Sequence, residues 1–379
     1  MQQKQKKKRI GVPEHLEELF AIKELNLVVL DPMLLDCLTK NNCMKLIASP
    51  SIQIGTFLAD MKLIEKVFKK KFNTKSWSLN VINHHTAVLT MNHWTGFEKK
   101  VVISVLQEDS NKDYFKISAE ESTETVQRGI DKFETVEMKG FTVPEEIERF
   151  QVWWKNGRFI DCNRTLADDL NKKSKNNTRI ITLEHMDNFK NFTNMLLESG
   201  QIPMLAYGTL LGWYRNCGMI PYTTDIDVVI KVAQYNETFA AEHKKMWNYG
   251  IHRVLAKHEY GIEMTIRIPG TVKDANADLF YLYPHNSTYE WTSVTYGKDS
   301  VYGWKRLKTF LPFVHDICTG DIDGHLFFIP CNYMEYIYAA YGTKDWLQPE
   351  EGYVYTGSDK LTFSDGYWSK DLDDIAKHY

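Results

Sequence analysis

The segment Tyr207–Ile230 (YGTLLGWYRNCGMIPYTTDIDVVI) limits the possible folds of this chain more than any other part of it. A Gly-Thr pair stands where a short helix is expected to begin, and Asp225 and Asp227 open a run of strand-forming residues. Residues two apart in a strand point to the same face, so we expect the two carboxylates side by side, about 7 Å apart at their Cα atoms. The segment therefore predicts a strand, a short helix and an acidic strand within a mixed α/β fold.

These residue types indicate phosphate chemistry. Two carboxylates at that spacing repel each other unless a cation lies between them, and hard oxygen ligands suit Mg²⁺ or Mn²⁺. The start of a helix has unpaired amides that bind phosphate, where Gly208 would let the backbone approach and Thr209 would add a hydroxyl donor. Asp278, near the start of the predicted strand Ala277–Tyr283, would complete the metal set. This order of elements is that of a nucleotidyltransferase fold.

Alternatives remain for each of these acids. A lone D-x-D pair occurs by chance in many chains, and Asp225 and Asp227 would then be a turn or capping pair. Asp278 alone would also suit the surface of an edge strand. A second pair, Asp321 and Asp323 (GDIDG), has glycine on both sides, which indicates a loop. If that pair bound metal instead, a glycosyltransferase would be the competing enzyme class.

Composition restricts the class of protein. A chain of 379 residues with 43% apolar and 13% aromatic residues can form two or three well-packed domains. The net charge of −3 provides no overall field for binding nucleic acid. The basic run Lys4–Arg9 is not followed by an apolar run of about 20 residues, so we expect either a soluble protein or a chain without its upstream anchor.

The cysteines and the N-x-S/T sequons bear on the compartment. The six cysteines are scattered without a CxxC pair, so disulfides are allowed but not required. The five sequons favour a secretory location. They lie at Asn163, Asn176, Asn191, Asn236 and Asn286.

The polar linker Asn171–Thr178 (NKKSKNNT) marks the clearest boundary in the chain. We expect a basic tail over residues 1–15, a smaller N-terminal α/β domain over residues 16–170 and the catalytic domain over residues 179–379. Ser51–Phe68 in the first domain and Gln234–Tyr249 in the second have helix-like patterns.

The motif GTLLGWYR…IPYTTDIDVV resembles the LicD family, which includes bacterial phosphocholine transferases and animal fukutins. The resemblance continues through Ala277–Tyr283 and Phe328–Pro330, and it ends with the closing motif Tyr341–Pro349. It therefore spans about Thr182 to Pro349. The preceding segment Arg158–Asn163 is similar to the fukutin-like branch.

This resemblance implies a metal-dependent transfer of an alditol phosphate, ribitol 5-phosphate in fukutins, from a CDP-activated donor to a sugar hydroxyl on a glycoprotein glycan. CMP is released, and the implied location is the Golgi lumen. Asp225, Asp227 and Asp278 would be both the metal ligands and the catalytic set, with Asp278 accepting the hydroxyl proton. Many members have further acids before the D-x-D, whereas this chain has Thr223 and Thr224, which leaves a second ion in doubt.

Three basic residues are the further candidates for binding the donor. Arg215, near the end of the short helix, would contact a phosphate, although a solvated arginine is an equal alternative. Lys305 and Arg306 would hold the CDP pyrophosphate. We expect no nucleic-acid partner, and a homo-oligomer or a complex with other glycosylation enzymes is possible. An inactive glycan-binding scaffold is the alternative function.

Overall fold

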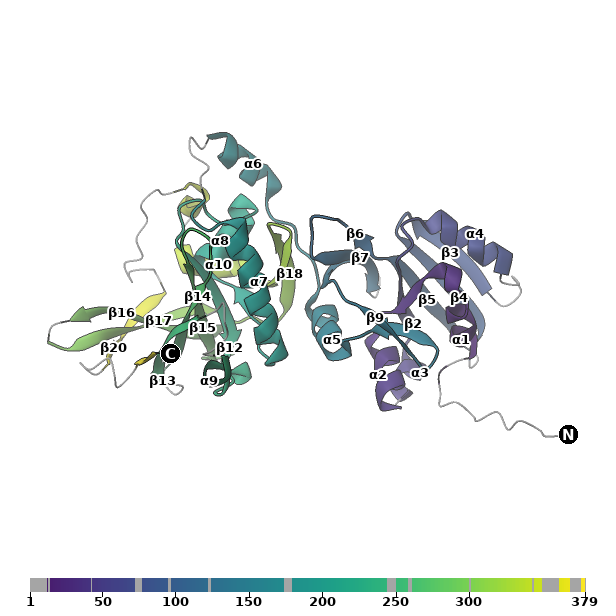
Figure 1. Ribbon diagram of the computed structural model, residues 1–379, viewed down its shortest axis with the longest axis horizontal. Helices are drawn as coiled ribbons and strands as arrows, with labels where there is room; N and C mark the ends of the chain where they lie inside the picture. Colours follow the sequence, from purple (N-terminus) through teal and green to yellow (C-terminus); the bar gives the residue numbers. More distant parts are fainter. Residues whose placement is uncertain are drawn as a thin grey trace. The chain divides into compact units, whose positions relative to one another are not determined.

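The structure is a computed structural model. It describes residues 12, 14–41, 43–71, 77–94, 97–121, 124–173, 179–243, 250–257, 261–299, 301–342, 344–349, 361–368 and 376–378. The chain divides into two compact units, Met1–Phe159 and Ile160–Tyr379, each with its own sheet and core (Figure 1). The expected mixed α/β class with an N-terminal domain is confirmed.

The first unit is built on a five-stranded sheet in the order β1-β2-β5-β4-β3. Only β2 and β5 run parallel in it. Its strands are β1 (Leu27–Val29), β2 (Ser51–Thr56), β3 (Trp77–Asn83), β4 (Thr86–Trp94) and β5 (Phe97–Val105). The smaller sheets contain β6 (Gln107–Glu108), β7 (Tyr114–Glu121) and β8 (Glu124–Asp131), and β9 (Thr135–Met138) and β10 (Phe141–Pro144). The helices are α1 (Glu14–Phe20), η1 (Lys23–Leu25), α2 (Pro32–Lys40), α3 (Met44–Ala48), α4 (Met61–Lys71) and α5 (Ile147–Asn156).

The expected helix over Ser51–Phe68 is wrong in its first half. Ser51–Thr56 forms β2, and a helix begins only at Met61. Ile52 and Ile54 are buried and alternate with half-buried neighbours, which is the two-residue period of a strand. The apolar spacing suited both periods over this short run, and the parallel pairing of β2 with β5 decided between them.

The second unit is built on a long mixed sheet in the order β18-β19-β11-β12-β15-β14-β13-β21. Within it β12 runs parallel to β15 and β11 runs parallel to β19. The strands are β11 (Met204–Leu205), β12 (Asp225–Lys231), β13 (Gly250–Lys257), β14 (Gly261–Ile268), β15 (Ala275–Pro284), β18 (Ile317–Ile322), β19 (His325–Pro330) and β21 (Ala376–His378). Three further strands continue from β15 as an arm (Figure 1), namely β16 (Tyr289–Asp299), β17 (Gly303–Pro312) and β20 (Thr362–Tyr367).

Helices of the second unit pack on this sheet and place the candidate site. Among them α7 packs on β14 and β19, and α8 packs on β12 (Figure 1). The helices are α6 (Arg164–Lys173), α7 (Leu183–Glu198), α8 (Tyr207–Asn216), η2 (Val232–Gln234), α9 (Phe239–His243), α10 (Tyr333–Tyr341) and η4 (Lys344–Leu347). Glycine follows α7 and α10 with positive φ, at Gly200 and Gly342, as is usual where a helix ends.

Two of the expected boundaries fall differently on the structure. The predicted helix Gln234–Tyr249 is interrupted, because η2 ends at Gln234 and α9 begins only at Phe239. Residues 244–249 lie outside the described residues. The first three residues of the expected linker, 171–173, belong to α6, and residues 174–178 again lie outside the described part. The two compact units meet in sequence at Phe159 and Ile160.

All six cysteines are paired in disulfides. The pairs are Cys37–Cys43, Cys162–Cys217 and Cys318–Cys331. Disulfides form and persist in oxidising compartments, so the pairing favours a secretory environment.

Among the described residues, no helix combines the length and the apolar character needed to cross a membrane.

Candidate metal centre

Three aspartates from two neighbouring strands meet at one point of the large sheet. Asp225 and Asp227 lie two residues apart on β12, and Asp227 is directly opposite Asp278 on the parallel strand β15. Each residue offers one carboxylate oxygen, and these oxygens all lie within 4.8 Å of one another. A single cation could therefore contact all three carboxylates.

The electrostatics of the cluster fit a divalent cation. The Asp227 side chain is mostly withdrawn from solvent, and this burial raises its pKa well above the ordinary range of a carboxylic acid. The neighbouring charges of Asp225 and Asp278 raise it further, while a hydrogen bond from the Gly208 backbone amide lowers it. Three crowded acids with hard oxygen donors form a set that Mg²⁺ or Mn²⁺ would stabilise.

Two threonine hydroxyls orient the outer carboxylates of the cluster. Thr223 Oγ1 donates to Asp225 Oδ1 at 3.1 Å, and Thr265 Oγ1, on β14, donates to Asp278 Oδ1 at 2.7 Å. Thr223 is one of the residues that stand where many LicD members have acids. Here its hydroxyl holds the Asp225 carboxylate in place, which an added acid would not do without further charge repulsion.

Gly208 and Thr209 lie beside the cluster, at the start of α8. A Cβ added at Gly208 would lie 3.5 Å from Asp227 Oδ2 and 3.9 Å from the Tyr341 hydroxyl. The Thr209 side chain is buried, and its Oγ1 accepts a hydrogen bond from the Asp227 amide at 2.8 Å. That hydroxyl links α8 to β12 just beyond the residues of β12 that pair with β11. In this structure it therefore positions Asp227. Phosphate binding by both residues stays a prediction.

Replacing Thr209 with valine is expected to reduce the free energy of unfolding by about 1–3 kcal/mol, because the buried Asp227 amide loses its acceptor while the shape of the side chain is kept. Chemical denaturation measures the change. Thr209→Ser is the matched control, since it keeps the hydroxyl and should retain most of the stability. Equal stability of the valine variant and the wild type would contradict the assigned contact.

The backbone at the entrance to α8 is strained. Tyr207 has a φ of 41°, a left-handed conformation that is uncommon for a non-glycine residue. Its side chain is held by a hydrogen bond of 2.6 Å between its hydroxyl and Thr292 Oγ1, and by edge contacts with Phe280 and Tyr336. These contacts fix the turn that brings the first amides of α8 to Asp227.

Arg215 lies inside the second unit. Its side chain is only 2% exposed, and Nη1 donates to the Trp346 carbonyl at 2.6 Å while Nε donates to Asn216 Oδ1 at 3.0 Å. These bonds attach the end of α8 to η4. The expected contact with a donor phosphate stays a prediction, and the alternative of a solvated arginine is wrong.

Lys305 and Arg306 lie on β17, in the arm. Arg306 forms an ion pair of 2.9 Å with Asp365 Oδ2, donates to the Asp365 carbonyl and lies over the Trp368 ring. Lys308 pairs with the same carboxylate at 3.1 Å. These contacts attach β17 to β20, so Arg306 and Lys308 are already paired within the arm. Binding of the donor pyrophosphate by Lys305 and Arg306 stays a prediction.

Replacing Arg306 with alanine separates the two interpretations of this cluster. Because the side chain holds β20 through charged hydrogen bonds, we expect the variant to lose about 1–3 kcal/mol of unfolding free energy. The KM for a CDP-alditol donor should not change. Steady-state kinetics and denaturation measure both quantities. A large rise in KM at unchanged stability would instead support binding of the donor pyrophosphate.

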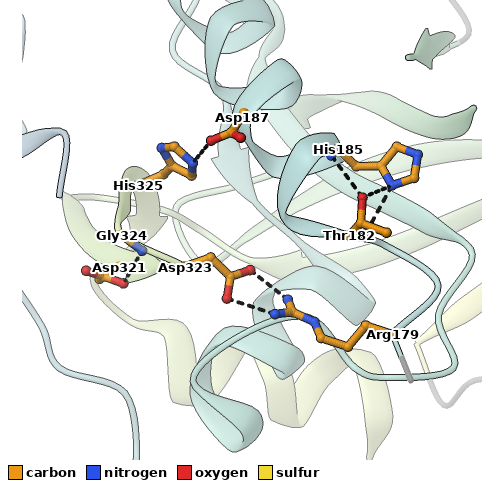
Figure 2. Close-up of polar contacts among 8 residues, drawn as sticks. All are labelled: Arg179, Thr182, His185, Asp187, Asp321, Asp323, Gly324 and His325. Carbon is orange, nitrogen blue, oxygen red and sulfur yellow. Dashed lines mark hydrogen bonds and ion pairs between the residues drawn. The ribbon is translucent and has the colours of Figure 1, made fainter. Parts of the chain in front are cut away.

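The second D-x-D pair lies where the β18–β19 hairpin turns, with Asp321 on β18 and Asp323 in the turn (Figure 2). Asp323 and Gly324 join β18 to β19 with φ values of 56° and 89°, as expected for an Asp-Gly turn between antiparallel strands. Arg179 forms a two-pronged ion pair with Asp323, at 2.9 and 2.6 Å, and Asp321 Oδ1 accepts from the Gly324 amide. The expected loop is therefore a tight turn at Asp323 and Gly324, whereas Asp321 still belongs to β18. The Asp323 carboxylate is engaged by Arg179, and metal binding by this pair stays an untested alternative.

Sequence reasoning missed two groups around the cluster. Glu263, on β14, is buried, and its charge also raises the pKa of Asp227. Tyr336, on the inner face of α10, is fully buried, and the nearby Asp227 contributes to the raised pKa of its phenol. Glu263 could have been found from the sequence, because it is the one acid in the largely apolar run that forms β14. Nothing in the local pattern of α10 set Tyr336 apart from the other tyrosines.

Two family models of known proteins match parts of this chain. Residues 201–332 match the family model described as LicD/FKTN/FKRP, nucleotidyltransferase domain, and this range contains all three aspartates. Residues 30–161 match the W02B3.4-like, N-terminal domain.

Three relatives show how similar the sequence is to those of known proteins. The chain is 26% identical over 246 residues to uncharacterized protein W02B3.4 of Caenorhabditis elegans. The matched segment covers 63% of this chain and 61% of that protein. It is 25% identical over 366 residues to uncharacterized protein T07A5.1 of the same organism, covering 90% and 88%. It is 24% identical over 252 residues to the human ribitol-5-phosphate transferase FKTN, covering 65% and 52%. The match therefore spans about half the length of the named transferase.

Proposed function

Because this chain is a fukutin-like member of the LicD family, we propose that it transfers an alditol phosphate from a CDP-activated donor to a sugar hydroxyl of a glycoprotein glycan and releases CMP. The observation that carries the proposal is the meeting of Asp225, Asp227 and Asp278 within 4.8 Å, beside the start of α8. Ribitol 5-phosphate is the group named for the FKTN relatives, and it is the first donor to test here.

Each residue of the cluster has a proposed task. Asp225, Asp227 and Asp278 would hold Mg²⁺ or Mn²⁺, which when bound offsets the negative charge of the donor phosphates. The first amides of α8, with Gly208 among them, would orient the phosphates at the N-terminal end of the helix dipole. Thr209 fixes the backbone of Asp227 and thereby the distance between helix and cluster.

Asp278 is the proposed acceptor of the proton from the attacking sugar hydroxyl. The Thr265 hydroxyl sets the direction of its carboxylate, and β15 places it directly beside Asp227. The hydroxyl oxygen would attack the phosphorus nearest the alditol, while the bond from that phosphorus to the CMP oxygen breaks and CMP leaves with the electron pair. A general base contributes about 10²–10⁴-fold to such a step.

We place this activity in the Golgi lumen or another secretory compartment. Three disulfides using all six cysteines support an oxidising environment. The direct test is to express the chain in animal cells behind a cleavable secretory leader and to follow it by microscopy against compartment markers. Folded protein with all three disulfides formed, in the Golgi or another compartment of the pathway, supports the assignment, and misfolding or degradation on entry contradicts it.

The proposed reaction is tested by measuring CMP release from the purified chain with CDP-ribitol, CDP-glycerol and CDP-choline, each with Mn²⁺ and a glycoprotein acceptor. We expect release with at least one alditol donor and dependence on the acceptor. Phosphocholine transfer alone would keep the phosphotransferase class and reject the alditol. No CMP from any donor, by a protein that still binds Mn²⁺, would reject the transferase.

An inactive scaffold is the alternative function for the same fold. It predicts no Mn²⁺-dependent rise in melting temperature with CDP present, because nothing would link metal binding to folding. The raised pKa of Asp227 gives a physical reason to prefer the enzyme, since a scaffold gains nothing from three acids crowded in one place.

A further inference from the structure

The sequon Asn286-Ser287-Thr288 lies in the loop that joins β15 to β16, and all three residues are exposed. Asn286 Oδ1 accepts hydrogen bonds from the amides of Thr288 and Tyr289, both at 2.8 Å. Its carboxamide oxygen is therefore engaged, while no hydrogen bond among the described residues uses its Nδ2. A groove of about 1090 Å³ borders Ser287, Thr288 and Tyr289, so there is open space beside the sequon.

Asn163 provides a contrast within the same unit. Its Oδ1 accepts from the Leu166 amide at 3.1 Å at the start of α6, and its Nδ2 donates to the Tyr214 hydroxyl at 3.4 Å. It is only partly exposed, and its neighbour Cys162 is held to Cys217. A sugar on this nitrogen would have to displace Tyr214, so the folded chain does not accommodate it.

Two further sequons among the described residues are less open than the one at Asn286. Asn191 is exposed on α7, but its partner Thr193 is buried and donates to the Lys190 carbonyl at 2.8 Å. Asn236 accepts from Thr238 in a similar turn but is only partly exposed. Asn176 lies outside the described residues.

We propose that Asn286 is an N-glycosylation site of this protein. In the modification, Asn286 Nδ2 forms a bond to C1 of the first sugar of a lipid-linked oligosaccharyl diphosphate. The bond from C1 to the diphosphate oxygen breaks, the diphosphate leaves with the electron pair, and Nδ2 loses one proton. The hydroxyl of Thr288 supplies the third position of the sequon. The three disulfides support passage through the oxidising pathway in which this modification occurs.

The test expresses the whole chain in animal cells behind a cleavable secretory leader, and it analyses both the retained and the secreted protein. Peptide mass spectrometry after treatment with peptide N-glycosidase identifies each modified asparagine by its conversion to aspartate. We expect conversion at Asn286 and none at Asn163. Asn286→Gln and Thr288→Val should each remove one glycan from the intact mass, whereas Thr288→Ser, the matched control, should keep it.

An unmodified Asn286 in protein that has entered the pathway would overturn the proposal, and so would equal occupancy at Asn163. Loss of the glycan in Asn286→Gln but not in Thr288→Val would also overturn it, because the sequon would then not be what is recognised. The melting temperature of the two variants, compared with that of wild-type protein treated with the glycosidase, separates loss of the glycan from misfolding. None of these outcomes depends on the transferase activity.

Discussion

Replacing Asp227 with asparagine is expected to lower CMP release by more than about 100-fold and, in metal-free protein, to raise the melting temperature. Activity falls because the central ligand of the cluster loses its charge, and metal-ion catalysis of phosphoryl transfer is worth several kcal/mol. Stability rises because the asparagine removes a carboxylate that is buried between two others. Such opposite changes are expected where a functional site crowds like charges at a cost in stability.

The stability gain should depend on pH. The pKa of Asp227 is higher in the folded protein than in the unfolded chain, so the folded state binds the proton more tightly. Its carboxylate therefore costs stability as the pH rises above the ordinary range of a carboxylic acid. The difference in melting temperature between the variant and the wild type should grow as the pH rises above the ordinary range of a carboxylic acid, and it should level off only above the raised pKa of Asp227. It should shrink as the pH falls toward that range, measured with a chelator present.

Asp323→Asn is the matched control for this experiment. It makes the same chemical change in the second D-x-D pair, and asparagine before glycine keeps the hairpin turn. CMP release should stay within a factor of about two. The role assigned to Asp227 would be refuted by undiminished turnover in Asp227→Asn, or by an equal loss in Asp323→Asn.

Replacing Lys231 with methionine is expected to destabilise the protein by about 3–5 kcal/mol, since it leaves a buried carboxylate without its cation. Lys231 Nζ contacts both oxygens of Glu290, at 2.6 and 2.5 Å, and the Val314 carbonyl at 2.9 Å. The Glu290 side chain is only 2% exposed. This pair joins the end of β12 to β16 and so holds the arm to the sheet that carries the aspartates.

Chemical denaturation of single and double variants measures this coupling. Adding Glu290→Gln to Lys231→Met should recover much of the lost stability, because the remaining group is neutral and still accepts the hydrogen bond from the Val314 amide. If the double variant were less stable than Lys231→Met alone, the loss would come from packing, and the uncompensated charge would not be its cause.

Local pattern was enough to predict the acidic half of the site. The two-residue period of β12 places Asp225 and Asp227 on one face, whatever surrounds them. The position of Asp278 beside them could not be predicted in the same way, because it depends on the parallel pairing of β12 with β15, which sets Asp227 opposite Asp278. Periodicity within one segment does not determine which strands become neighbours, and the motif order of a known family supplied that information.

Other features depended on contacts between distant segments and could not be predicted from local pattern. Arg306 appears as part of an exposed basic cluster in the sequence, but Asp365 from a much later strand engages it. Thr209 was expected to face the substrate, yet its hydroxyl completes the hydrogen bonding of β12. The helix expected over Ser51–Phe68 failed for the same reason, because pairing with β5 decided the state of its first half.

The most direct measurement of the central claim is a calorimetric titration of Mn²⁺ into the metal-free chain with CDP present, repeated for Asp278→Asn and Asp323→Asn. Because we propose that the three aspartates on β12 and β15 form one cation site, wild type and Asp323→Asn should bind with equal affinity, while Asp278→Asn should bind at least about 10-fold more weakly. No saturable binding to the wild type, or unchanged binding to Asp278→Asn, would contradict a metal-dependent transferase at this cluster.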